Sequence, residues 1–182
     1  MKRLWSAFAG VAAIALAGCA STQREDAPPV PAGPATVTAD VRDPGGRVLA
    51  RAFLEEVGDS VRVRFEAVDL VQGAYGAHIH TTGRCDPPAF ASAGPHWNPT
   101  GQQHGKDNPQ GMHRGDLPNL LVGTDRRGSF EYTIPGASLA GRGPNALIDA
   151  DGAAVVVHQQ ADDYRTDPSG NSGARLACGV LG

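Results

Sequence analysis

Short runs in which apolar and polar residues alternate recur along most of the chain. The first three span 35–41, 47–54 and 60–68, and turn-forming residues separate them at 43–46 and 58–59. Successive side chains of a β-strand point to opposite faces, so a period of two indicates strands with one buried face. Glycine, proline and aspartate between the runs favour tight hairpins. The pattern therefore predicts antiparallel strands joined by short turns.

Five later segments extend the strand pattern, at 75–80, 129–134, 146–149, 153–158 and 175–180. No segment carries a convincing apolar stripe for a helix of three turns. About eight short antiparallel strands in one domain predict an all-β fold, a Greek-key β-barrel or sandwich.

Two long segments lack a strand pattern and are predicted to be functional loops. The first runs from His80 to Leu120, and the second spans 159–174 and is rich in aspartate, serine and glycine. Such long stretches count against a compact domain unless something other than apolar packing orders them. A metal can order a loop of this kind, and the first segment contains several histidines.

The first eighteen residues have the pattern of a secretory signal. A basic start at 2–3 precedes an apolar run at 4–16, which is too short to span a bilayer as a mature helix. The residues Leu-Ala-Gly before Cys19 resemble a bacterial lipobox, which predicts lipidation of this cysteine as the first mature residue. An ordinary cleaved signal with an incidental cysteine is the alternative.

The remaining chain is expected to form a tether and one domain. Residues 19–35 are rich in proline and poor in apolar residues, so they are predicted to be an extended tether behind the lipid. Residues 36–182 have a normal size for a single domain with a hydrophobic core. We expect a periplasmic, lipid-anchored protein, and Ala20 in place of an aspartate favours the outer membrane.

Cys85 and Cys178 remain once Cys19 carries lipid, and in an oxidising compartment they are expected to form one disulfide. The chain-entropy model assigns a link across so long a loop about 4–5 kcal/mol. Ligation of a metal is the alternative, which their large separation disfavours.

The charge balance gives little indication of a macromolecular partner. The chain has 16 basic and 19 acidic residues, and loss of Lys2 and Arg3 with the signal leaves the mature charge near −5. No basic stripe is present, which argues against nucleic acid as a partner. The membrane is expected to be contacted only through the lipid.

All six histidines stand at spacings that suit metal ligation. His78 and His80 lie two apart in one predicted strand and so point to the same face. A single His-x-His motif is weak evidence for a metal site. His158 strengthens it, because this residue ends another apolar strand, 153–157. Three imidazoles that leave open positions suit a redox copper better than a structural zinc.

A second potential ligand set lies in the first long loop. It consists of His104, His113 and Asp116, with His96 between the two groups in sequence. Three nitrogens and one carboxylate make a closed tetrahedral site, as expected for structural zinc. Asp116 could instead be an ordinary turn residue before Pro118, although the nearby histidines favour ligation.

Several motifs together resemble the copper-zinc superoxide dismutase family. The matching segments are GAHIH at 76–80, GPHWNP at 94–99, HGKDNP at 104–109, HRGDLP at 113–118, VVVHQQADDY at 155–164 and SGNSGARLACG at 169–179. The resemblance extends over most of 36–182. It implies that superoxide is disproportionated to dioxygen and hydrogen peroxide, with copper and zinc ions as cofactors.

The resemblance also implies a role for each site residue. The implied copper ligands are His78, His80, His96 and His158, and the implied zinc ligands are His96, His104, His113 and Asp116. His96 would bridge the two metals and supply a proton. Asp162 would hydrogen-bond ligand histidines of both metals and orient them, whereas Asp163 is expected to be a solvated loop acid. Arg175 would receive the anionic substrate beside the copper.

Two other classes of function remain as alternatives. A periplasmic protein that buffers or delivers copper and zinc would need the ligands but not Arg175. A structural or adhesive β-sandwich would leave six histidines at ligand spacings unexplained. The sequence does not decide between a monomer and a homodimer.

Overall fold

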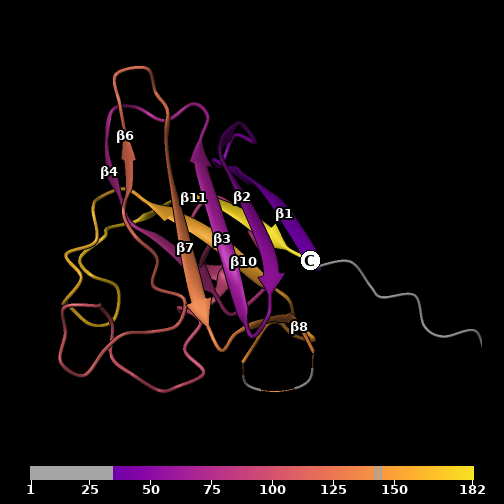
Figure 1. The fold of residues 1–182 in the computed structure, drawn as a ribbon. Helices are drawn as coiled ribbons and strands as arrows, with labels where there is room; N and C mark the ends of the chain where they lie inside the picture. Colours follow the sequence, from indigo (N-terminus) through magenta and orange to yellow (C-terminus); the bar gives the residue numbers. More distant parts are fainter. Residues whose placement is uncertain (1–34, 142, 144) are drawn as a thin grey trace, which may run out of the picture. The chain divides into compact units, whose positions relative to one another are not determined.

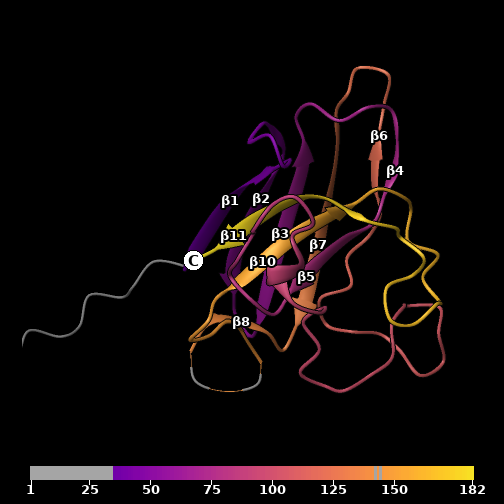
Figure 2. The same cartoon turned by 180° about the vertical axis from the view of Figure 1, so that it is seen from behind.

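The computed structural model describes residues 35–141, 143 and 145–182, and Figures 1 and 2 show this part from opposite sides. Its secondary structure is almost entirely β, with one short 3₁₀ turn, η1 (Ala91–Ala93). The predicted signal, the lipidation expected at Cys19 and nearly all of the tether lie outside the described residues. No helix in the described part is long and apolar enough to cross a membrane.

The described residues form eleven strands, so the all-β prediction is confirmed. The strands are β1 (Thr36–Arg42), β2 (Val48–Val57), β3 (Ser60–Ala67), β4 (Gly73–Tyr75), β5 (Ala77–His80), β6 (Leu120–Val122), β7 (Gly128–Pro135), β8 (Ser138–Ala140), β9 (Ala146–Ile148), β10 (Ala153–His158) and β11 (Arg175–Leu181). Seven of them form one sheet in the order β5-β10-β11-β1-β2-β3-β7. The consecutive hairpin strands β1, β2 and β3 with β11 returning beside β1 have the strand order of a Greek key.

The predicted strand at 75–80 is wrong as a single element, because the chain changes partners at Gly76. β4 pairs with β6, whereas β5 pairs with β10. Between them, the Gly76 amide donates to the Gln160 carbonyl at 2.7 Å, and its own carbonyl accepts from the His158 amide at 2.8 Å. A Cβ atom at this position would lie 2.9 Å from the Cβ of Ser172, so the crossing requires glycine.

The expectation of antiparallel pairing throughout is also corrected at one small sheet. β8 and β9 pair in parallel, and each has only three residues. β6 and β8 were not among the predicted strands. A segment of three residues is too short to display alternation, so only its pairing partner defines it as a strand.

The core forms because the alternation seen in the sequence places one face of each strand inward. In β3, Val61, Val63 and Phe65 are fully buried, while Arg62 and Arg64 between them are exposed. β5 and β10 differ, since every one of their residues is buried. These two strands therefore present their second face to something other than solvent, and the long loops cover it.

The sheet brings the predicted site residues together at one edge. β5 is the edge strand, and its pairing with β10 places His78 opposite Val156. β10 pairs in turn with β11, with His158 opposite Arg175. The first long loop returns to β5 through two isolated bridges, His80 to His96 and His78 to Asp116. In both views this loop and the 159–174 loop run side by side (Figures 1 and 2).

Candidate metal centre

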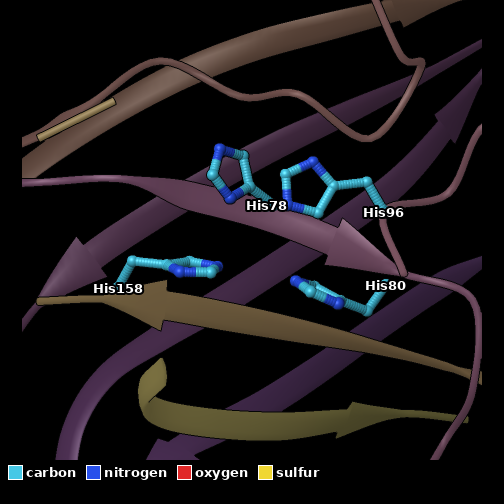
Figure 3. A group of neighbouring side chains, drawn as sticks. All are labelled: His78, His80, His96 and His158. Atoms are coloured by element: carbon cyan, nitrogen blue, oxygen red, sulfur yellow. The ribbon is translucent and has the colours of Figure 1, made fainter. Parts of the chain in front are cut away.

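Four histidine rings converge at the edge of the sheet (Figure 3). His78 and His80 come from β5, His158 from the end of β10, and His96 from the first long loop. One ligand nitrogen from each of them lies within 4.8 Å of the others, and all four residues are buried. Four imidazoles at this spacing can bind one transition-metal ion.

One nitrogen of each ring in this cluster has no hydrogen-bond partner in the described structure. These atoms are His78 Nδ1, His80 Nε2, His96 Nε2 and His158 Nε2, and all are buried. A buried polar atom without a partner is destabilising, because it has lost its water and gained nothing in return. Four such atoms in one cluster therefore fit a bound cation, and a redox copper matches the donor set.

The opposite nitrogen of each ring is held by the protein. His78 Nε2 donates to Asp162 Oδ2 at 2.8 Å and His80 Nδ1 to the Gly94 carbonyl at 2.8 Å. His158 Nδ1 donates to the Gly173 carbonyl at 3.1 Å. A ring that donates through one nitrogen presents the lone pair of the other, so these partners fix both the tautomer and the direction of the free nitrogen.

A second cluster surrounds the carboxylate of Asp116. The Nδ1 atoms of His96 and His104 each lie 3.0 Å from Asp116 Oδ1, and His113 Nδ1 lies 3.2 Å from it. His113 Nδ1 is also 3.4 Å from His96 Nδ1. One ligand atom from each of His78, His96, His104 and Asp116 lies within 4.8 Å of the others. We favour His113 as the fourth member, because one His78 nitrogen is engaged with Asp162 and its other faces the first cluster.

His96 belongs to both clusters through its two nitrogens. Nε2 is one of the four unpartnered atoms of the first cluster, and Nδ1 contacts Asp116 in the second. The clusters are adjacent, since the ring centroids of His78 and His96 are 4.0 Å apart. Three histidines and one carboxylate match the donor set of a tetrahedral zinc site.

Burial keeps the first cluster neutral. Desolvation lowers the pKa of His78 from 6.5 to about 3 and that of His158 to about 4. It also lowers the pKa values of His80 and His96, with the nearby charges of other histidines adding to the effect at His80. Neutral imidazole is the form that binds metal, so these shifts favour ligation near neutral pH.

In the second cluster one histidine, His104, favours the protonated form. His104 faces a carboxylate with each ring nitrogen, Asp116 Oδ1 from Nδ1 and Asp162 Oδ1 from Nε2, both at 3.0 Å. Burial disfavours its protonation, but these hydrogen bonds outweigh the burial and raise its pKa to about 9. Hydrogen bonds from the histidines likewise outweigh burial at Asp116 and Asp162 and hold the pKa of each carboxyl well below 3.8.

Asp162 connects the two clusters. One oxygen accepts from His78 of the first, and the other accepts from His104 of the second. Asn119 holds its backbone, accepting from the Asp162 amide at 2.8 Å and donating to its carbonyl at 2.9 Å. Gly170 packs so closely that a Cβ atom there would overlap Asp162 Oδ1. Asp162 is thus fixed from several sides.

Arg175 lies at the wall of a cavity of about 910 Å³ that His80, His96 and His158 also line. Its Nη1 and Nη2 atoms donate to the carbonyls of Phe90 and Gly94, each at 2.6 Å. The guanidinium therefore stands at a defined place beside the first cluster. A fixed positive charge at the entrance to a metal site attracts a small anion.

The predicted disulfide between Cys85 and Cys178 is confirmed. It joins β11, which carries Arg175, to the start of the segment that supplies the two carbonyl acceptors of that arginine. The link therefore limits how far the guanidinium can move from the loop that holds it.

Several residues that shape the site did not emerge from the sequence. Asn119 clamps Asp162, and Asp167 Oδ1 accepts from the His104 amide at 2.7 Å. The Asn108 side chain donates to the carbonyls of His104 and Arg165 and so joins the two loops. Asp163 is exposed as expected, yet it also accepts from Thr166 at 2.6 Å. Of these residues, only Asn108 could have been found from the sequence, because it belongs to the HGKDNP motif.

Comparisons with known proteins agree on one family. A family model described as copper/zinc superoxide dismutase matches residues 47–181. Superoxide dismutase [Cu-Zn] 2 of Aquifex aeolicus is 42% identical over 139 residues, covering 75% of this chain and 80% of the relative. Superoxide dismutase-like protein YojM of Bacillus subtilis is 43% identical over 138 residues, with 75% and 70% covered.

A solved structure agrees with the sequence comparisons. The crystal structure of a SOD-like protein from Bacillus subtilis matches with a TM-score of 0.74 and 38% identity. The match covers 79% of this chain and 97% of that one.

Proposed function

The chain belongs to the copper/zinc superoxide dismutase family, and from this premise we propose a role for each site residue. The protein is an oxidoreductase that acts on superoxide, with copper and zinc as its cofactors. In our proposal the first cluster holds copper and the second holds zinc. The copper ligands are His78, His80, His96 and His158, and the zinc ligands are His96, His104, His113 and Asp116.

The four unpartnered nitrogens carry this proposal. Each belongs to a proposed copper ligand, and each lies opposite a nitrogen that the protein already engages. A non-metal role would leave four buried polar atoms in one place without compensation. Bound copper would supply the redox chemistry, taking an electron from one superoxide and giving it to another.

The chain's own residues would bind the anion and move the proton. Arg175 lines the cavity beside the proposed copper ligands and presents a positive charge that a metal buffer would not need. His96 faces both clusters, so its Nε2 can take up a proton and pass it to the departing peroxide, with the second proton coming from solvent, while Nδ1 stays held in the second cluster. Asp162 keeps His78 and His104 oriented throughout.

Replacing Arg175 with alanine is expected to lower kcat/KM for superoxide by about tenfold, the lower end of the range for electrostatic focusing. The protein is negatively charged overall, so only a local charge can attract the anion. Superoxide consumption should be measured at several ionic strengths, together with copper and zinc content. Arg165→Ala is the matched control, because Arg165 is exposed and does not line the cavity. Full activity of Arg175→Ala would contradict the assignment.

We further propose that Cys19 carries lipid, which anchors the protein to the outer membrane and leaves the domain in the periplasm. The lipobox-like sequence before Cys19 supports the anchor, and the disulfide fits an oxidising compartment. Cys19→Ser is expected to abolish incorporation of labelled fatty acid and release the protein into the soluble periplasmic fraction. Ala20→Asp should keep the lipid but move the protein to the inner membrane. Continued lipid labelling of Cys19→Ser would refute the anchor.

A further inference from the structure

A second cavity, of about 320 Å³, reaches the proposed zinc cluster from outside. His113 lines it, together with its chain neighbours Met112 and Arg114, and Gln102 and Tyr132 also belong to the lining. We call the cavity of about 910 Å³ beside Arg175 the copper-side cavity, and none of its lining residues lines this smaller one. The two clusters therefore have separate openings among the described residues.

The burial of the second cluster is uneven in a way that matches this opening. The side chain of His113 is 9% exposed, whereas that of His104 is fully buried and that of Asp116 is 3% exposed. His96 is the cluster member that lines the copper-side cavity. A metal ion leaving the second cluster would thus meet solvent either past His113 or by passing through the copper cluster.

Arg114 and Pro135 both line the small cavity and are hydrogen-bonded to each other. Arg114 Nη1 donates to the carbonyl of Pro135, so the side chain links the zinc-binding loop to the end of β7. It places a positive charge in the cavity wall next to His113. A dication passing this point is repelled, so the charge slows movement in both directions.

We propose that zinc enters and leaves through the cavity beside His113, independently of copper, and that Arg114 is the barrier on this route. The inference rests on the proposed zinc site. It concerns the path of the ion and not the reaction, since superoxide and copper use the other cavity. It predicts that the two metals exchange at rates that can be changed separately.

Two variants should move the zinc exchange rate in opposite directions. Gln102→Trp fills the cavity from an exposed rim position and should slow zinc loss by about tenfold, because exchange must then wait for local opening of the loop. Arg114→Gln removes the opposing charge and should speed zinc loss by about tenfold, within the range of local electrostatic effects on rates. The experiment uses the full-length chain loaded with copper and zinc, and follows zinc transfer to an excess of a chromophoric chelator at constant pH.

Matched variants separate the route from general effects of size and charge. Thr133→Trp adds the same bulk on the exposed side of β7, outside the cavity lining, and should leave the zinc rate unchanged. Arg127→Gln removes a charge just before the first residue of β7 and should also leave the rate of zinc loss unchanged. Ala91→Trp narrows the copper-side cavity and should slow copper removal without slowing zinc loss.

The outcomes distinguish this route from the proposed zinc site itself. Zinc content is measured before the chelator is added. A parent chain that holds no zinc would overturn the site and the route together. A parent that holds zinc, with Gln102→Trp and Arg114→Gln both releasing it at the parent rate, would overturn the route alone. Slower zinc loss from Ala91→Trp, with Gln102→Trp at the parent rate, would overturn the route and show that zinc leaves through the copper-side cavity.

Discussion

Replacing Asp162 with asparagine is expected to weaken the binding of both metals by about 10- to 100-fold, the usual cost of losing a partner that orients ligands. One carboxylate accepts from His78 in the first cluster and from His104 in the second. The amide is uncharged, so both histidines lose their charged acceptor, and because it offers a single oxygen one of them must also face an amide N–H. The effect is large because Asp162 is buried and Gly170 leaves it no room to shift.

Competition titrations of copper and zinc against chelators of known affinity would measure the loss. Asp163→Asn is the matched control, since Asp163 is exposed and hydrogen-bonds Thr166 and Asn171 but no histidine. It should perturb the loop while leaving both affinities within a few-fold of the parent. Loss of only one metal from Asp162→Asn would show that the carboxylate serves a single site. Unchanged affinities would remove it from the metal centre.

Acid is expected to destabilise the metal-free chain steeply between pH 6.5 and about pH 3. His78 and His158 have pKa values lowered to about 3 and about 4 by burial, and the pKa values of His80 and His96 are also lowered. Below pH 6.5 the unfolded chain therefore binds protons that the folded chain does not. As the pH is lowered through this window, the free energy of unfolding decreases by up to about 1.4 kcal/mol per pH unit for each histidine.

His104 acts in the other direction at higher pH. Its pKa is raised to about 9, so its contribution is fully present below pH 6.5 and is lost as the pH rises through 9. The metal-free chain should therefore be most stable near pH 6.5. Urea unfolding of chelator-treated protein from pH 4 to 9 would measure the profile, and His158→Gln should flatten its acid limb by about one proton. A profile that stays flat from pH 6.5 to 4 would contradict the burial of uncharged histidines.

The larger strands and the ligand types could be predicted from the sequence because their signals are local. Alternation over eight residues defines β3, and His78-x-His80 needs only the period of a strand to share one face. The three-residue strands β6 and β8 were missed because their identity depends on partners elsewhere in the chain. The parallel pairing of β8 and β9 has no pattern in either segment.

The supporting residues of the metal centre could not be predicted for the same reason. Asn119 and Asp162 are 43 positions apart, and Asp167 and His104 are 63 apart. Asparagine and aspartate are also common in turns, so their type alone gives no indication of a distant partner. Their roles become visible only when the two long loops lie against each other.

The carbonyl oxygen of Gly94 accepts from both His80 Nδ1 and Arg175 Nη2. One peptide unit therefore positions both the ring of a proposed copper ligand and the guanidinium proposed to attract the substrate. Gly94 has a φ of 76°, and an added methyl group would press against the hydroxyl of Thr81 at 2.6 Å. If the proposed roles hold, redesigning this loop for a different anion would shift the arginine and the copper ligand together, so anion selectivity and electron transfer could not be engineered separately through it.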